Sequence, residues 1–555
     1  MTGLARSLTL LTFGAALAGC GPAEEATLAA FGRVWTGDST QPWAQAVAVR
    51  ADTIMAVGDS AAIAALIGPD TERFYNNGAM IVPGLIDDHT HFMSGGFQLA
   101  SVDLRDAASP EEFTARLEAH AARLRPGEWI TGGDWDHELW PEAGLPRRDW
   151  IDSVTPDNPV FVSRLDGHMG LANTLALELA GISAATPDVP GGVVVRYPGG
   201  REPTGLLKDN AMDPLWEAIP DASPSQRDSA LARALRHAAS NGVTAIAEMD
   251  GTWWNWAAYR RARDGGRLTL RVAFHHPLSD WRALADSMAG LDSAADDWLW
   301  LGGAKGFVDG SLGSSTALFD QPYSDDPTTG GTLTTSEDSL RAWIGAADSA
   351  GIQLAIHAIG DRAIALVLDI FDSVAAAHGP RDRRLRVEHA QHLRPDDFAR
   401  FAELGVIAST QPYHAIDDGR WAEKRIGSER IKATYAFRSF LDAGVHLAFG
   451  SDWTVAPLAP LLGVYAAVTR RTIDGRFPDG WTPEQKITIE EALLAYTASN
   501  AYGMYRERRL GRLVPGYLAD FVLLSEDLTA IPPAQIESVR VRATIVGGRV
   551  VFQQE

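Results

Sequence analysis

The chain has 555 residues, of which 46% are hydrophobic and 22% are charged, and its formal net charge is −22 at pH 7. This length exceeds one ordinary domain and suits a large barrel with a second unit, while the composition excludes large-scale disorder. A surface this acidic repels phosphate backbones, so no nucleic-acid partner is expected.

The first residues resemble a bacterial lipoprotein signal. Arg6 precedes an apolar run over residues 8–17, which is too short to span a membrane, and small residues lead to Cys20, the single cysteine. We expect residues 1–19 to be removed, Cys20 to be lipidated and residues 20–26 to form a tether. The expected location is the cell envelope, on the periplasmic or outer surface side. An ordinary secretory signal is the alternative.

Both ends of the mature chain carry the alternating pattern of short strands. Residues 46–50 and 53–58 show it near the N-terminus, and residues 520–524 show it near the C-terminus. We expect residues 27–82 and 511–555 to form one small β-sandwich domain built from both termini.

The region between them, residues 83–510, alternates apolar strand-like runs such as 160–162 and 270–274 with helical stretches such as 225–240. This alternation predicts an α/β fold, a (β/α)8 TIM-like barrel. Residues from about 127 to 209 are rich in Trp, Pro and Gly and predict an insertion over the barrel mouth. Its tryptophans either line an apolar pocket or pack in the insertion's core: Trp129, Trp135, Trp140 and Trp150.

Two histidines end an apolar run at the start of the barrel region. His89 and His91 are separated by one residue, and side chains at i and i+2 of a strand point the same way. Both imidazoles can therefore reach one divalent ion such as zinc. An isolated pair of this kind also arises by chance, so the interpretation needs further ligands.

Three further ligand-type residues follow apolar runs, namely His357, His389 and Asp452. The C-terminal ends of barrel strands converge on one rim, so these side chains can meet the first pair there. Each histidine alone is more simply a structural residue. The joint pattern favours a shared metal site.

Lys305 lies in an apolar strand context, where burying an ammonium group is costly. Carbamylation by carbon dioxide would convert it into an anionic bridge between two metal ions. Pairing with Asp309 or Glu248 is the alternative. Lys208 and Glu248 are other candidates for the bridge, and a one-metal site without any bridge also remains open.

The whole set resembles the amidohydrolase superfamily and, within it, the YtcJ-like branch of amidohydrolase family 3, from about residue 29 to residue 551. That pattern has His-x-His on strand 1, a lysine on strand 4, histidines on strands 5 and 6 and an aspartate on strand 8. Here it falls on His89 and His91, Lys305, His357, His389 and Asp452. The branch resemblance rests on Asp166-Gly167-His168, Pro203-Thr204-Gly205, residues 305–311 and 357–361, and Gln411-Pro412.

The resemblance implies a hydrolase acting on an amide-type C–N bond of a small molecule, with one or two divalent metal ions, zinc or a similar ion. Binding to the metal ion would lower the pKa of water to roughly 7, and the resulting hydroxide would attack the substrate carbon. Asp452 would carry the proton to the leaving group. His168 and His414 would hydrogen-bond the tetrahedral oxygen, unless they only hold their loops together.

The second nitrogens of the ligand imidazoles need acceptors, for which Asp88 and Glu388 are the candidates. The same site would also serve hydrolysis of a cyclic amide or a deamination. A lipoprotein that binds solute without catalysis is the remote alternative, and it predicts no metal.

Overall fold

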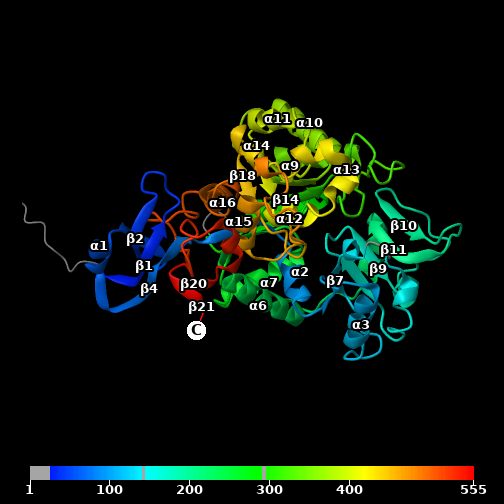
Figure 1. Cartoon of the computed structure of the whole chain (residues 1–555), viewed down its shortest axis with the longest axis horizontal. Coiled ribbons are helices and arrows are strands. Elements are labelled where there is room, and N and C mark those ends of the chain that lie inside the picture. The colour runs from blue at the N-terminus through cyan, green and yellow to red at the C-terminus, as the bar shows by residue number, and fades with distance from the viewer. Residues whose placement is uncertain (1–24, 141–143, 291–295, 555) are drawn as a thin grey trace, which may run out of the picture.

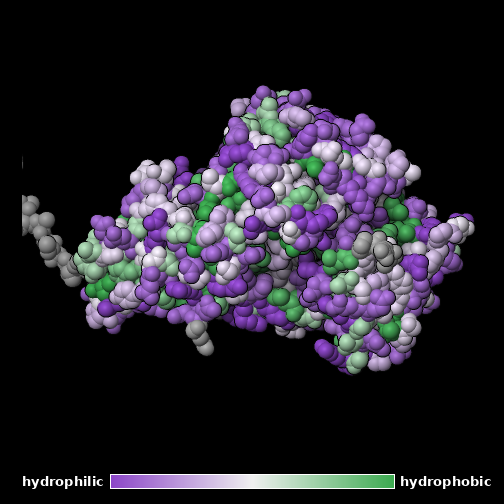
Figure 2. All heavy atoms as spheres, viewed as in Figure 1, coloured by the Kyte–Doolittle hydropathy of each residue, from purple (hydrophilic) through white to green (hydrophobic). Residues whose placement is uncertain are grey.

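A computed structural model describes residues 25–140, 144–290 and 296–554 (Figure 1). The predicted signal peptide and Cys20 lie outside these residues, as does most of the tether. In the described part of the chain, no helix combines the length and apolar character needed to cross a membrane. The visible face is mostly hydrophilic (Figure 2), in keeping with the high charge.

Eight parallel strands form the central sheet, and the order in space follows the order in the chain. The first and last strands also meet, because the Asp452 N–H donates to the His89 carbonyl over 2.8 Å and Thr90 bridges Trp453. The predicted TIM-like barrel is therefore confirmed. Its strands are β5 (Leu85–Thr90), β12 (Val243–Glu248), β13 (Arg271–Pro277), β14 (Leu299–Phe307), β15 (Leu354–Ala358), β16 (Arg386–His389), β17 (Ile407–Thr410) and β18 (Leu447–Phe449).

Amphipathic helices connect and cover the barrel strands. In α10 (Asp361–His378), the buried Ile364, Val367, Leu368 and Phe371 recur at helical spacing and form one apolar face. The other helices of this region are α2 (Phe92–Gln98), α6 (Pro224–Ser240), α7 (Trp253–Asp264), α8 (Trp281–Gly290), α9 (Glu337–Ser349), α11 (Asp397–Leu404), α12 (Pro412–Asp418), α13 (Ala422–Arg430), α14 (Phe437–Asp442), α15 (Pro460–Thr469), α16 (Ile489–Ala495) and α17 (Ala498–Gly503).

Strands from both chain ends form one continuous seven-stranded sheet at one end of the molecule (Figure 1). The long strand β4 joins the two halves, because Val82 pairs with Val522 of β19 in antiparallel register. The order is β21 (Arg549–Gln553), β20 (Val541–Val546), β19 (Phe521–Leu524), β4 (Ile67–Pro83), β1 (Ala26–Trp35), β2 (Trp43–Arg50) and β3 (Thr53–Gly58), with the short helix α1 (Ser60–Ala64) beside it.

The insertion has a separate six-stranded sheet at the opposite end of the molecule (Figure 1). It begins at Val102, upstream of the expected start near residue 127, because a strand of two residues gives no periodic signal. Its elements are β6 (Val102–Asp103), α3 (Pro110–Ala121), β7 (Gly132–Trp135), β8 (Phe161–Arg164), β9 (Met169–Ala172), α4 (Thr174–Leu179), β10 (Gly192–Arg196), β11 (Pro203–Asp209) and α5 (Asp213–Ala218). The strand expected at 160–162 is thus β8 and lies outside the barrel.

The insertion's tryptophans pack in its own core. Trp135 and Trp140 are buried and stack with ring centroids 6.3 Å apart, while Trp150 and Trp129 pack against the insertion's two apolar clusters. None of these four lines the hollows at the barrel mouth. Core packing is therefore the alternative that the structure favours.

Candidate active site

Three histidines converge on Asp452 at the C-terminal ends of the barrel strands. The Nε2 atoms of His91 and His89 lie 3.2 and 3.5 Å from Asp452 Oδ1, and His389 Nδ1 lies 3.9 Å from its Oδ2. Ligand atoms of His89, His389 and Asp452 all lie within 4.8 Å of one another. The structure thus brings these predicted residues together from β5, β16 and the loop after β18.

His357 completes the cluster from β15. Its ring centroid lies 4.5 Å from that of His389. Its Nε2 lies 3.1 Å from the Gly310 carbonyl oxygen, so the ring donates there and Nδ1 keeps its lone pair. All four predicted imidazoles and the predicted carboxylate therefore share one rim of the barrel, where His91 is partly exposed and the other four are buried.

The candidates for the bridging group were Lys305, Lys208 and Glu248. Of these three, only Lys305 contacts the cluster. Lys305 Nζ lies 3.0 Å from His89 Nε2, and burial lowers its pKa to about 8. Lys208 instead donates to the Ser314 carbonyl over 2.7 Å. Glu248 accepts hydrogen bonds from the Tyr259 hydroxyl and, over 3.1 Å, from the Asp250 N–H.

Asp309, a suggested partner for Lys305, has another role. Its carboxylate accepts hydrogen bonds from the backbone N–H groups of Leu318 at 2.7 Å, Gly360 at 2.9 Å and Ile359 at 3.0 Å. These bonds join the loops after β14 and β15. Burial raises the pKa of Asp309 to about 7.

Hydrogen bonds beneath the rim set the orientation of two imidazoles. His89 Nδ1 lies 2.6 Å from Glu388 Oε2, and His389 Nδ1 lies 2.9 Å from Gln411 Oε1. In each ring the Nδ1–H donates, so Nε2 presents its lone pair. Although burial raises it, the pKa of Glu388 is held well below its usual value by Arg386 and His89. The other expected acceptor, Asp88, bonds Arg386 at 2.9 Å instead.

The donor set fits a divalent cation. Asp452 Oδ1 is buried between two imidazole nitrogens and has no hydrogen-bond partner within the described chain. Burial raises the pKa of Asp452, but the neighbouring histidines hold it well below its usual value, so the carboxylate is charged. Imidazole and carboxylate are ligands that zinc and related ions accept. A cation would satisfy the oxygen that the protein leaves unpaired.

Backbone strain also concentrates at this rim. Asp452 has φ 58° and His389 has φ 71°, in the left-handed region that side chains disfavour. Such strain persists only where surrounding structure enforces it, and it gathers at functional sites.

The cluster opens into a cavity of about 70 Å³, which is lined by His91, His168, Lys305, His414 and Asp452 among others. A hollow of about 510 Å³ between the barrel and the insertion shares His91 and His168 with this cavity. The cavity at the cluster and the hollow beside the insertion are therefore neighbours.

The two histidines predicted to contact substrate both lie beside the cluster. His168 Nδ1 lies 2.6 Å from Asp209 Oδ1, and its ring centroid lies 5.2 Å from that of His357. His414 stacks 6.5 Å from the His389 ring, and its Nε2 lies 4.0 Å from Asp452 Oδ2. Asp209, which holds His168, has no signal in the sequence pattern.

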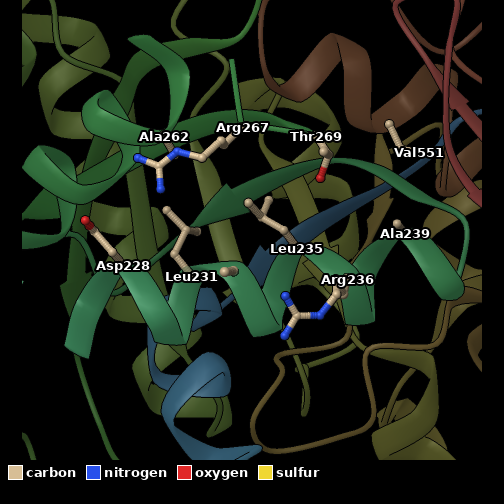
Figure 3. A pocket seen from close by; sticks show the side chains of 10 residues that line it. Asp228, Leu231, Leu235, Arg236, Ala239, Ala262, Arg267, Thr269 and Val551 are labelled. Carbon is tan, nitrogen blue, oxygen red and sulfur yellow. The ribbon is translucent and has the colours of Figure 1, made fainter. Parts of the chain in front are cut away.

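A second hollow, of about 190 Å³, lies away from this rim, between α6, α7 and β21 (Figure 3). Leu231, Leu235 and Val551 make it largely apolar, and its Asp228 is paired with Arg261 at 2.6 Å. Its described lining contains no group of metal ligands, so it is not the candidate site.

The fold and the site together define a barrel enzyme whose strand ends carry a candidate metal centre. The chain belongs to the amidohydrolase family, whose sequence profile, described as "Amidohydrolase family", matches residues 77–552. The predicted family is confirmed.

Curated relatives and a solved structure are similar to this chain over most of its length. Protein LONG AFTER FAR-RED 3 of Arabidopsis thaliana is 41% identical over 94% of this chain and 90% of its own length. Putative amidohydrolase YtcJ of Bacillus subtilis is 32% identical over 88% and 91%. N-substituted formamide deformylase of Arthrobacter pascens is 30% identical over 94% and 97%.

An uncharacterized metal-dependent hydrolase from Pyrococcus horikoshii superposes with a TM-score of 0.74 and 28% identity, covering 91% of this chain and 99% of that chain. Family, relatives and fold together identify this chain as a hydrolase of the amidohydrolase family.

Proposed function

We propose that the protein hydrolyses the amide-type C–N bond of a small molecule with one or two divalent ions, zinc or a similar ion. The proposed ligands are His89, His91, His357, His389 and Asp452. The observation that supports this most is Asp452 Oδ1, a buried acceptor without a partner in the described chain that lies between two imidazole nitrogens.

When bound, the ion would supply Lewis acidity toward the carbonyl and would lower the pKa of water. Asp452 would accept the proton of the attacking water and return it to the leaving nitrogen. His168 would donate a hydrogen bond to the tetrahedral oxygen, with Asp209 holding its other nitrogen. His414, whose Nε2 has no partner among the described residues, would contact the same oxygen.

N-substituted formamides are the first substrate class to try, because one relative is named for them. The test is metal analysis of purified protein, followed by amine release from formamides, acetamides and cyclic amides. We expect one to two equivalents of metal, and loss of amine release after chelation that added zinc restores. Protein that takes up no metal, or hydrolyses amides equally well without it, would disprove the proposal.

Lys305 is proposed to carry a carbamate. Its amine would add to carbon dioxide, forming an N–C bond and releasing one proton, and the resulting anion would bridge two ions. The contact between Lys305 Nζ and His89 Nε2 supports this assignment. Native mass spectrometry should show the mass of one carbon dioxide and two ions. Lys305→Met should lose both the added mass and one ion, whereas the control Lys208→Met should keep them.

We also propose that Cys20 carries a lipid anchor in the cell envelope, as the first twenty residues suggest. Metabolic labelling with palmitate and membrane fractionation test this. Cys20→Ser should abolish labelling and move the protein to the soluble fraction. Unchanged fractionation of that variant would contradict an anchor at this position.

A further inference from the structure

Among the described residues that line the active-site cavity, one has an unpaired buried polar atom that the proposed mechanism does not use. Three of these described residues have a buried side-chain atom without a hydrogen-bond partner: Asp452 Oδ1, His414 Nε2 and Trp421 Nε1. The first two belong to the proposed catalytic machinery. Trp421 follows α12, and its indole N–H is a donor without an acceptor.

Packing holds the Trp421 ring in place. The side chain is buried, with 8% relative exposure. The guanidinium carbons of Arg164 and Arg425 lie 5.9 and 5.8 Å from its ring centroid. A buried N–H without a partner destabilises a fold, and buried polar groups are nearly always bonded. A ligand that enters the cavity would supply the missing acceptor.

The charges around Trp421 define the kind of acceptor. Arg164 is paired with Asp166 at 2.7 Å and Asp136 at 3.2 Å. Arg425 is paired with Glu138 at 2.6 Å and Asp325 at 3.1 Å. Each guanidinium therefore already has two carboxylate partners.

Two more carboxylates line the same cavity. Asp417 is paired with Arg420, while Asp418 accepts hydrogen bonds from Gln391 at 3.0 Å and from the Tyr435 hydroxyl. Asp417 and Asp418 would repel an anionic group placed beside Trp421, because the two neighbouring guanidinium groups are already paired with carboxylates, and burying an unpaired charge is costly. A neutral acceptor, such as an ether, ketone or amide oxygen, avoids that cost.

We infer that the Trp421 N–H donates a hydrogen bond to a neutral oxygen that the substrate carries away from its scissile bond, and that this subsite rejects anionic substrates. The inference rests on the proposed amide hydrolysis and narrows it to neutral amides with a second hydrogen-bond acceptor. Trp421 acts in substrate selection, and no proton transfer is assigned to it.

Binding of ketones tests this without turnover, because ketones have no C–N bond to hydrolyse. The probes are benzylacetone, its ortho-, meta- and para-methoxy derivatives, and its para-carboxylate. Calorimetric titration would compare metal-loaded wild type with Trp421→Phe, which keeps an aromatic ring and removes the N–H. Trp254→Phe is the control, because Trp254 lies on α7 with 64% exposure.

We expect the best methoxy probe to bind wild type about tenfold more tightly than benzylacetone. Trp421→Phe should abolish this preference and leave benzylacetone affinity unchanged, and Trp254→Phe should change neither. The carboxylate should bind at least about tenfold more weakly than benzylacetone. Thermal unfolding would verify that the variant is folded.

A wild type without methoxy preference, an equal loss for all probes in Trp421→Phe, or tightest binding of the carboxylate would each overturn the inference. The wild-type comparison decides the matter even if the variant fails to fold. Failure of the proposed amide hydrolysis would give a different result. The metal-loaded protein would then hydrolyse no amide, whichever ketone probe it bound most tightly.

Discussion

Two buried charged clusters of this protein differ in how completely their polar atoms are paired. At the N-terminal end of β13, Arg271 donates to both Asp520 oxygens at 2.6 and 2.8 Å and to the Asp297 carbonyl at 2.9 Å. Asp520 also accepts the Gly547 N–H at 2.8 Å. At the opposite end of the barrel, Asp452 Oδ1 has no hydrogen-bond partner in the described chain.

This difference separates an ion pair that stabilises the fold from a cluster that is suited to bind a ligand. The Arg271–Asp520 pair joins the barrel to the terminal sheet, and its bidentate geometry satisfies both charges. The Asp452 cluster instead brings imidazole nitrogens together with a carboxylate oxygen that is unpaired in the described chain and that an added cation would bind. Burial and charge are common to both clusters, so the unpaired atoms distinguish the candidate site.

Asp452→Asn is expected to give the largest effect on activity. The amide keeps the shape of the side chain but cannot carry the proton, so turnover of a formamide should fall about a thousandfold. Metal content should be retained, and stability should not decrease. Steady-state amine release and metal analysis measure this. Turnover within a few fold of wild type would remove Asp452 as the proton carrier.

Arg271→Met should produce the opposite pattern. It leaves Asp520 charged and buried, which should lower the free energy of unfolding by about 3–5 kcal/mol. The turnover of the folded fraction should stay at the wild-type value. Denaturant unfolding measures the loss, and the double variant Arg271→Met/Asp520→Leu should recover much of it. A stable single variant would mean that the pair contributes little.

His168→Leu should reduce kcat about a hundredfold with little change in KM, because it removes one donor to the tetrahedral oxygen. Asp209→Asn, which keeps a hydrogen-bonding group beside His168, should have a smaller effect. Steady-state kinetics on one formamide compare the two variants. A change in KM alone would show that His168 only holds the insertion against the barrel.

Glu388→Gln should weaken metal affinity by about 10- to 100-fold, because the neutral amide accepts more weakly from the His89 ring. Asp88→Asn is the matched control. Asp88 shares the Arg386 partner but does not contact an imidazole, so its replacement should leave metal affinity nearly unchanged. Competition with a chelator measures both, and equal losses would contradict the role of Glu388.

Sequence reasoning found the strand-end residues because their signal is local. His89 and His91 end an apolar run, and His357, His389 and Asp452 follow runs of the same kind. The family resemblance also fell on Lys305 and not on Lys208, and the structure puts Lys305 at His89 and Lys208 at Ser314. For the four histidines and Asp452, the gathering at one rim was therefore predictable without coordinates.

Contacts across large sequence separations were not readable. Asp209 holds His168 from 41 positions away, and Glu388 meets His89 from 299 positions away. Trp421 has no motif around it, and its unpaired N–H appears only once its neighbours are known. The early start of the insertion at Val102 was missed because so short a strand has no period.

What the sequence determined alone was the barrel alternation, the strand-rich character of both termini and the residues that end each barrel strand, because each depends on local patterns of apolar and polar side chains. Only the tertiary structure decided which nitrogen of each imidazole is free, which lysine reaches the centre and which buried atoms remain unpaired. These are properties of distances between distant segments, and they arise when the chain closes into a barrel.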